Sequence, residues 1–102
     1  MKTITISHLY NLSEVLGVIS SQPMPLEQAS DVADFIEAVA EKFPALESER
    51  MEIVSIEDEK DKNEKLGEFG GRKVEVPEIS FKGFSLRLTP NHVQILKACE
   101  LF

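Results

Sequence analysis

The sequence predicts an α+β fold, in which a helical hairpin packs on a small, mainly antiparallel sheet and a C-terminal helix closes the core. Three observations favour it: helical periodicity between residues 9 and 43, period-two alternation after residue 73, and a Thr-Pro helix start near the end. With 102 residues, 42% of them hydrophobic, the chain is large enough for one core and too small for two. We therefore expect a single domain over residues 1–102.

The first element is a short strand followed by a helix. Residues 2–6 alternate and are rich in β-branched side chains, which favours a strand. Ser7 is then the expected N-cap, and Gly17 falls on the polar face of the helix. The helix should end near Ser21, because the prolines that follow it prevent continuation. Its apolar stripe consists of Leu9, Leu12, Val15, Leu16 and Ile19.

The second helix has the most regular periodicity in the chain, and Pro25 is expected at its first position. Phe35 falls at the edge of the apolar stripe, where partial exposure is expected. The short connection predicts an antiparallel hairpin. In it, four residues of the second helix should pack against Leu12, Leu16 and Ile19 of the first: Val32, Ile36, Val39 and Phe43. The stripe consists of Leu26, Ala29, Val32, Ala33, Ile36, Val39, Ala40 and Phe43.

The middle of the chain leaves an alternative open at residues 44–57. Pro44 either kinks one long helix or begins a new one, and residues 51–56 also suit a strand. The helix is favoured, because Glu47, Glu49, Arg50 and Glu52 are good helix formers. Residues 58–63 have almost no apolar content, so they form a fraying helix or a loop. Three glycines at 67, 70 and 71 predict a flexible passage.

The last third changes period. Residues 73–81 and 84–88 alternate, and Lys82-Gly83 between them predicts a tight turn. Pro77 indicates a bulge or an edge position. Thr89 and Pro90 predict an N-cap and a first helical residue, respectively, of a short helix that runs to the end of the chain.

Charge is unevenly distributed. Residues 1–71 carry fifteen acids and six bases, for a net charge of −9, and residues 72–102 carry three acids and five bases, for +2. The total of −7 argues against nucleic acid or an anionic membrane as the ligand, since both require basic residues. It suits either a basic patch on another protein or simple solubility. A single Cys, no signal-like start and no long apolar run predict a cytoplasmic protein.

Groups that support catalysis or metal binding are sparse. His8 and His92 are far apart, Cys99 lies on an apolar helix face, and no spacing typical of a zinc site is present. The acidic run at residues 57–64 places Lys60 and Lys62 where a calcium loop needs oxygen ligands, which favours a solvated surface. The sequence therefore predicts no enzyme activity, no metal site and no cofactor.

A small acidic chain of this kind most often acts by binding. We expect one acidic helix face to meet a basic surface on a partner protein, with Phe35 at its border as an aromatic anchor. Two alternatives stay open: a structural component that acts as a homo-oligomer, and an acidic mimic of nucleic acid. The face comprises Asp31, Asp34, Glu37 and Glu41, extended by Glu49 and Glu52.

The order of elements resembles a known group of proteins. A helix over residues 9–19, a long acidic helix from residue 26, the segment Lys65-Leu66-Gly67-Glu68-Phe69, the extended Val74-Glu75-Val76 and the Thr89-Pro90 helix resemble small accessory proteins of phages and prophages of Gram-positive bacteria. The resemblance implies a phage-encoded protein in the host cytoplasm that inhibits or modulates a host protein system. It brings no catalytic residues with it.

Overall fold

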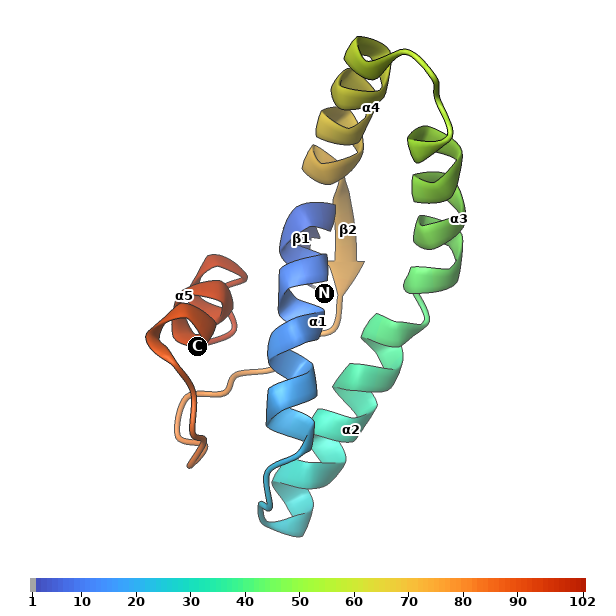
Figure 1. Ribbon diagram of the computed structural model, residues 1–102. Coiled ribbons are helices and arrows are strands. Elements are labelled where there is room, and N and C mark those ends of the chain that lie inside the picture. Colours follow the sequence, from blue (N-terminus) through green and yellow to red (C-terminus); the bar gives the residue numbers. More distant parts are fainter. Residues whose placement is uncertain (1) are drawn as a thin grey trace.

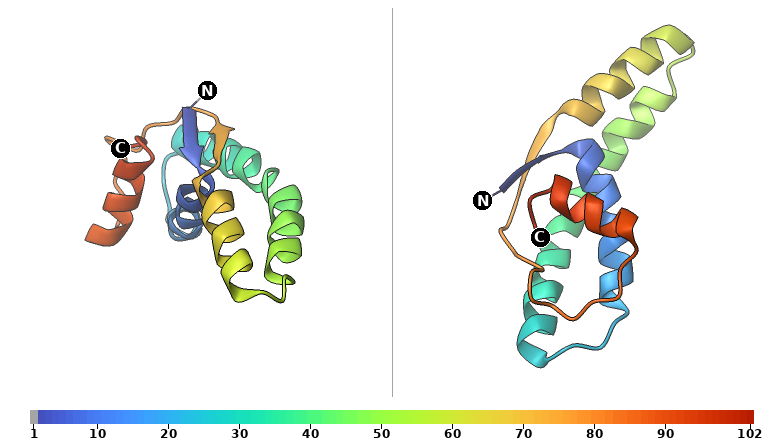
Figure 2. Two further views of the ribbon diagram at one scale, coloured as in Figure 1. Left: turned by 90° about the horizontal axis from the view of Figure 1, so that it is seen from above. Right: turned by 90° about the vertical axis from the view of Figure 1, so that its left-hand side faces the viewer.

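The computed structural model describes residues 2–102 and has the predicted α+β architecture (Figure 1). In chain order the elements are β1 (Lys2–Thr5), α1 (Ile6–Ser20), α2 (Leu26–Ala40), α3 (Phe43–Val54), α4 (Glu59–Gly71), β2 (Lys73–Val76) and α5 (Pro90–Ala98). The molecule is elongated, with principal extents of 49 × 25 × 23 Å. Helices α3 and α4 form a hairpin that projects beyond the remaining elements (Figure 2).

The sheet joins segments that are about seventy residues apart in the sequence. Strand β1 pairs with β2 in antiparallel register, with Lys2 opposite Val76 and Thr5 opposite Lys73. The pairing continues into α1, where the Ile6 amide donates to the Arg72 carbonyl at 2.8 Å. The predicted strand at residues 2–6 is thus confirmed through Thr5.

Helix α1 is the centre of the core. Its N-cap is Thr5, whose hydroxyl accepts from the His8 amide at 3.2 Å, so the expectation that Ser7 caps this helix is wrong. Both residues offer a hydroxyl, and the end of strand β1 decides which one is used. The helix ends at Ser21 as predicted. Ile6 is buried, and so is every residue of the predicted stripe, which consists of Leu9, Leu12, Val15, Leu16 and Ile19.

Helix α2 packs on α1 as the hairpin prediction requires, although its apolar stripe is narrower than expected. Pro25 is its N-cap, so the helix begins at Leu26, one residue later than predicted, and Leu26 is 85% exposed. Ala33 and Ala40 are also exposed. The expected partial exposure of Phe35 is wrong, because its ring is 3% exposed and packs edge-to-face on Phe81 at 6.3 Å. Phe81, in the last third of the chain, therefore covers Phe35, so that the buried face of α2 includes Phe35.

Pro44 begins a new helix and does not kink an old one. Helix α2 ends at Ala40, α3 begins at Phe43, and Pro44 occupies its first turn, where a missing amide hydrogen bond costs nothing. The prediction of helix over strand in this region is confirmed as far as Val54. The two helices on either side of this break point in different directions (Figure 1).

The predicted flexible passage at the three glycines is wrong, because residues 67, 70 and 71 all lie inside α4. Phe69 anchors this helix: its ring is 6% exposed and lies 6.5 Å from that of Tyr10. A Cβ atom at Gly70 would come within 2.5 Å of the Ser7 hydroxyl, so any other residue requires that hydroxyl to move. Tertiary contact thus compensates for poor helix propensity.

The predicted hairpin of strands over residues 73–81 and 84–88 is only partly correct. Strand β2 ends at Val76, and residues 77–89 form neither a helix nor a strand. Their backbone is held elsewhere: the Phe81 amide donates to the Leu101 carbonyl at 2.8 Å, and the Gln22 side chain bonds to both backbone groups of Arg87. The turn at Lys82-Gly83 is present, and Gly83 has φ +90°.

The C-terminal helix starts as predicted and ends early. Thr89 caps α5 by accepting from the His92 amide at 3.3 Å, and Pro90 is the first helical residue. The helix stops at Ala98 because Glu100 adopts φ 57°, and the Leu101 amide then donates to the Leu96 carbonyl at 2.9 Å. This is a Schellman-type end without glycine. It buries Leu101 completely.

Candidate protein-binding surface

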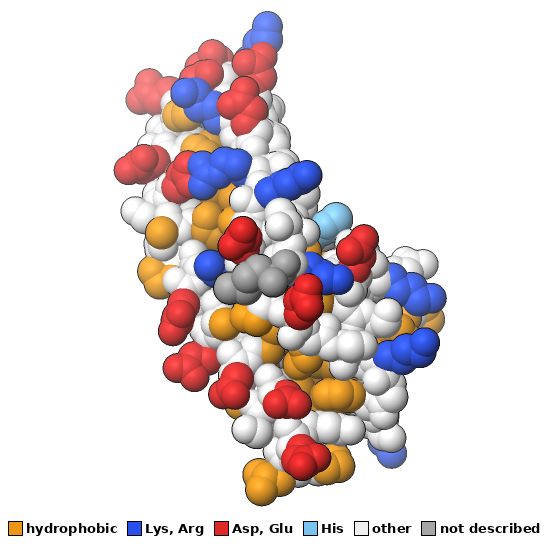
Figure 3. Space-filling model, turned by 180° about the vertical axis from the view of Figure 1, so that it is seen from behind, with side chains coloured by type: hydrophobic (Ala, Val, Ile, Leu, Met, Phe, Trp, Pro, Cys, Tyr) orange, Lys and Arg blue, Asp and Glu red, His pale blue; other side chains and the backbone are white. Residues whose placement is uncertain are grey.

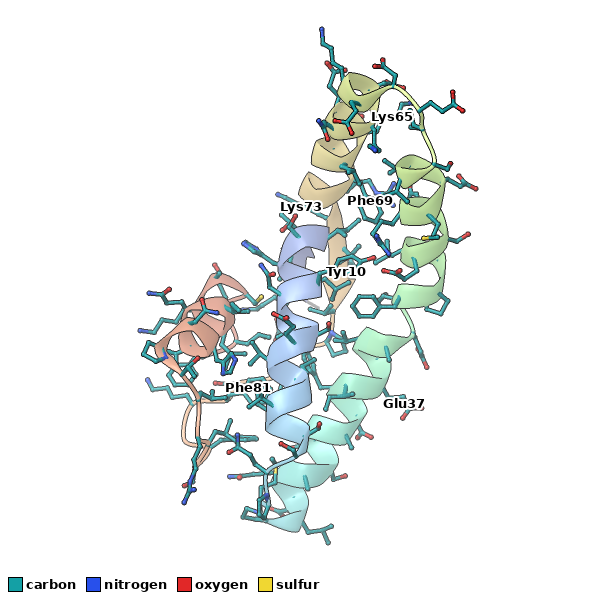
Figure 4. The ribbon with its side chains drawn as sticks, viewed as in Figure 1. Tyr10, Glu37, Lys65, Phe69, Lys73 and Phe81 are labelled. Atoms are coloured by element: carbon teal, nitrogen blue, oxygen red, sulfur yellow. The ribbon has the colours of Figure 1, made fainter. Side chains whose placement is uncertain are left out.

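The predicted acidic face of α2 is exposed. Asp31, Asp34 and Glu37 lie on the solvent side of the helix, and Glu41 follows at its C-terminal end. Among residues 2–102 none of these four carboxylates takes part in an ion pair. Figure 3 shows acidic side chains following α2 toward one end of the molecule, and Figure 4 shows Glu37 projecting away from α1. These carboxylates are therefore available to an external cation.

Glu49 and Glu52 belong to a different surface. Both carboxylate oxygens of Glu49 accept from the Arg72 guanidinium, at 2.5 and 2.8 Å. This fork of hydrogen bonds lowers the pKa of Glu49. Glu52 lines a groove between α3 and α4 together with Lys65 and Glu68. The break between α2 and α3 separates the predicted extension from the α2 face, and Glu49 already has its partner.

Phe35 cannot serve as the exposed aromatic anchor that the sequence suggested, because it is part of the core. The apolar surface next to Asp31 and Asp34 comes instead from Ile79 and Phe84, which are half-buried. These residues line a groove of about 460 Å³ between α2 and residues 77–84. Sequence reasoning missed this neighbour, since alternation in the last third predicted paired strands and not a segment lying along α2.

A second polar cluster lies where α1 meets α3. The Tyr10 hydroxyl donates to Glu47 at 2.6 Å, and Arg50 donates to the other oxygen of that carboxylate at 2.9 Å. Burial and then the Glu47 carboxylate raise the pKa of Tyr10 to about 12, while the hydrogen bond from Arg50 lowers the pKa of Glu47. The Tyr10 ring also packs edge-to-face on Phe43 at 5.2 Å. This cluster ties α3 to the core.

His92 and Cys99 have structural environments. His92 Nδ1 accepts from the Thr89 amide at 3.4 Å and completes the capping box of α5. Cys99 is 1% exposed, and burial raises the pKa of its thiol, which disfavours the nucleophilic thiolate. Within residues 2–102 no three His, Cys, Asp or Glu side chains come together as metal ligands would.

Comparisons with known proteins give no relative. No family model matches the chain, and neither a curated protein nor a solved structure matches it significantly. The helices between residues 2 and 102 are too short or too polar to cross a lipid bilayer. The surface itself is therefore the basis for a functional proposal.

Proposed function

We propose that this chain is a non-enzymatic protein-binding module whose α2 acidic surface (Asp31, Asp34, Glu37 and Glu41) docks on a basic patch of a partner protein. The observation that carries the proposal is the lack of internal partners for these carboxylates. The ion pairs within residues 2–102 use Glu47, Glu49, Glu59 and Glu100, all of which lie outside α2.

The chemistry of such a surface favours association with a cationic protein. Four exposed carboxylates on one helix create a local negative potential, which attracts a basic surface and accelerates encounter. Half-buried Ile79 and Phe84 beside Asp31 and Asp34 add apolar area of the kind found at interface centres. The resemblance to phage accessory proteins suggests that the partner is a host protein whose activity this chain inhibits or modulates.

The test is affinity capture from a bacterial lysate with the wild-type chain and a charge-reversed variant. Asp34→Lys with Glu37→Lys should abolish capture of the partner and slow its association in a purified system, because both changes place positive charge opposite the basic patch. The fold should survive, because both side chains face solvent. The effect should shrink in 1 M salt, where the Debye length is about 3 Å.

A matched control separates local contact from overall charge. Glu57→Lys with Glu64→Lys makes the same change in net charge at two exposed positions of the α3–α4 hairpin, one in the connecting loop and one in α4. It should leave affinity close to that of the wild type. Equal loss of binding in both double variants would contradict a specific role for α2, and unchanged binding in the Asp34/Glu37 variant would contradict the proposal.

A further inference from the structure

An apolar groove runs between α1 and α2 on the side of α1 that also carries Tyr10. Its volume is about 320 Å³, and its walls include Leu16 and Gly17 from α1, Ile36 and Ala40 from α2, and Phe43 at the start of α3. Ile36 and Phe43 pack against the core and remain partly exposed. The structure thus leaves apolar side chains uncovered in a concave surface.

The hydroxyl groups in the groove do not make it polar. The Ser13 hydroxyl donates to the Tyr10 carbonyl at 3.1 Å, and the Ser20 hydroxyl donates to the Gly17 carbonyl at 2.9 Å. Both hydroxyls use their hydrogen atom within their own helix, so neither is left as a donor to a ligand. An occupant of the groove must therefore be apolar where it touches the floor.

Gly17 shapes the floor. It lies in the middle of α1, where glycine is less favourable than any residue except proline. A Cβ atom placed there would meet no other atom within 4 Å, so no contact within residues 2–102 requires glycine at this position. Its small size instead allows another backbone or side chain to come close to α1.

The rest of the same helix face is already covered by helices. Tyr10 lies two turns before Gly17 on this face, and it packs against Phe43 of α3 and Phe69 of α4 (Figure 4). Beyond Phe43 the face is open. A further helix in the groove would continue the covering that α3 and α4 provide at the Tyr10 end.

The length of the groove fits a helix. Its α1 wall extends from Ser13 to Ser20, eight residues whose ends are about 10 Å apart along the axis. Anchors at positions i, i+4 and i+7 of a docked helix cover the same distance. Helices commonly bind in grooves between two others by this spacing.

The rim of the groove is acidic. Glu14 lies one turn from Gly17 on α1, and Glu37 and Glu41 lie one turn apart beside Ala40 on α2; all three are exposed. An occupant with Lys or Arg beside its apolar anchors would complement this rim. A second copy of the chain would not, because a symmetric contact through this groove places the acidic rim against itself.

We infer that the α1–α2 groove is the docking site for an amphipathic helix of a partner, with apolar anchors on one face and basic residues beside them. The inference rests on the proposed function and specifies the partner's form: the acidic surface attracts a basic segment, and the groove receives its apolar face.

The test uses two helix-stabilised synthetic peptides and the full chain labelled with nitrogen-15. Both peptides carry leucines at positions i, i+4 and i+7; one has lysines beside them and the other has glutamates at the same positions. The lysine peptide should shift the amide resonances of Gly17, Ile36 and Ala40 and bind at least about tenfold more tightly than the glutamate peptide at low salt. No binding of the lysine peptide, equal binding of both, or shifts confined to other helices would overturn the inference.

A matched pair of variants tests the groove itself. Gly17→Leu fills the floor of the groove and should lower the affinity for the lysine peptide at least about tenfold. It should not lower the melting temperature of the protein. Gly67→Leu is the control, since Gly67 is also exposed within a helix and has no atom within 4 Å of a built Cβ. It should bind as the wild type does, and equal affinities in the two variants would overturn the inference.

Two further outcomes decide between related readings. A scattering mass of a dimer, with a Gly17 amide shift that depends on protein concentration alone, would assign the groove to a second copy and refute a partner helix. If the Gly17→Leu variant still captures the lysate partner that the Asp34→Lys, Glu37→Lys variant loses, the proposed function stands and the groove inference fails.

Discussion

Helix α1 and the α3–α4 hairpin are stabilised by different kinds of contact. Helix α1 buries six apolar side chains, whereas α3 buries only Leu46 and α4 only Phe69. Polar contacts add to these two apolar anchors of the hairpin, namely Tyr10 with Glu47 and Glu49 with Arg72. Burial of apolar area is the larger source of stability, and surface ion pairs contribute little.

The difference teaches that this small domain need not open as one unit. The hairpin projects from the body of the molecule (Figure 2), and the residues at its tip are exposed and mostly charged. Elements with few buried contacts open at lower free energy than the core. We therefore expect the hairpin to exchange its amide protons faster than α1, and the following changes sharpen or break this contrast.

The largest effect should come from the core of α1. Leu12 is fully buried in the middle of that helix, so Leu12→Ala should lower the free energy of unfolding by about 2–5 kcal/mol. Urea denaturation followed by circular dichroism measures this. A loss below 1 kcal/mol would show that α1 is not the centre of the core.

Truncating the hairpin anchor should act locally. Phe69→Ala removes the ring that packs on Tyr10 and should cost about 3 kcal/mol of the opening free energy of the hairpin, or roughly a hundredfold in exchange rate. Hydrogen exchange should show faster amides in α3 and α4 and unchanged amides in α1. Uniform acceleration over all helices would mean that the domain opens as a single unit.

The Tyr10 hydroxyl, which donates to Glu47, should lose its proton only at strongly alkaline pH. Because Tyr10 is the only tyrosine and the chain has no tryptophan, the phenolate absorbance reports on this residue alone, with an expected midpoint of about 12. A raised pKa means that the contact stabilises the fold below pH 10, and that this stability is lost as pH rises from 10 toward 12.

Glu47→Gln should lower that midpoint and leave part of the shift, since burial contributes as well as the carboxylate. A wild-type midpoint near 10 would contradict the packed position of the ring.

At acidic pH the sign is opposite: the lowered pKa values of Glu47 and Glu49 mean that hairpin protection is lost as pH falls below about 4.5.

The smallest effect should come from helix propensity in α4. Gly67 is exposed and its neighbourhood is empty, so Gly67→Ala should stabilise the hairpin by about 0.5–1 kcal/mol. Slower amide exchange in α4 measures this gain. Gly70→Ala should have the opposite effect, because its Cβ would meet the Ser7 hydroxyl. Amide exchange in α4 should then be faster than in the wild type.

Local features of the sequence determined much of the fold. Caps, prolines and apolar periodicity located α1, α2, α5 and strand β1, because such signals act over one or two turns of chain. The exposure of Asp31, Asp34, Glu37 and Glu41 followed from the same periodicity. The neighbours of that face did not, because they come from residues about fifty positions away.

Only the tertiary structure decided the remaining features. Pairing of β1 with β2 and the packing of Phe35 on Phe81 join distant segments, and no local pattern encodes which of several partners wins. The glycines of α4 are helical because Phe69 is buried, against their own propensity. The groove at Gly17 exists because α3 and α4 cover only the first half of one face of α1, and helix lengths and crossing positions set where that cover stops.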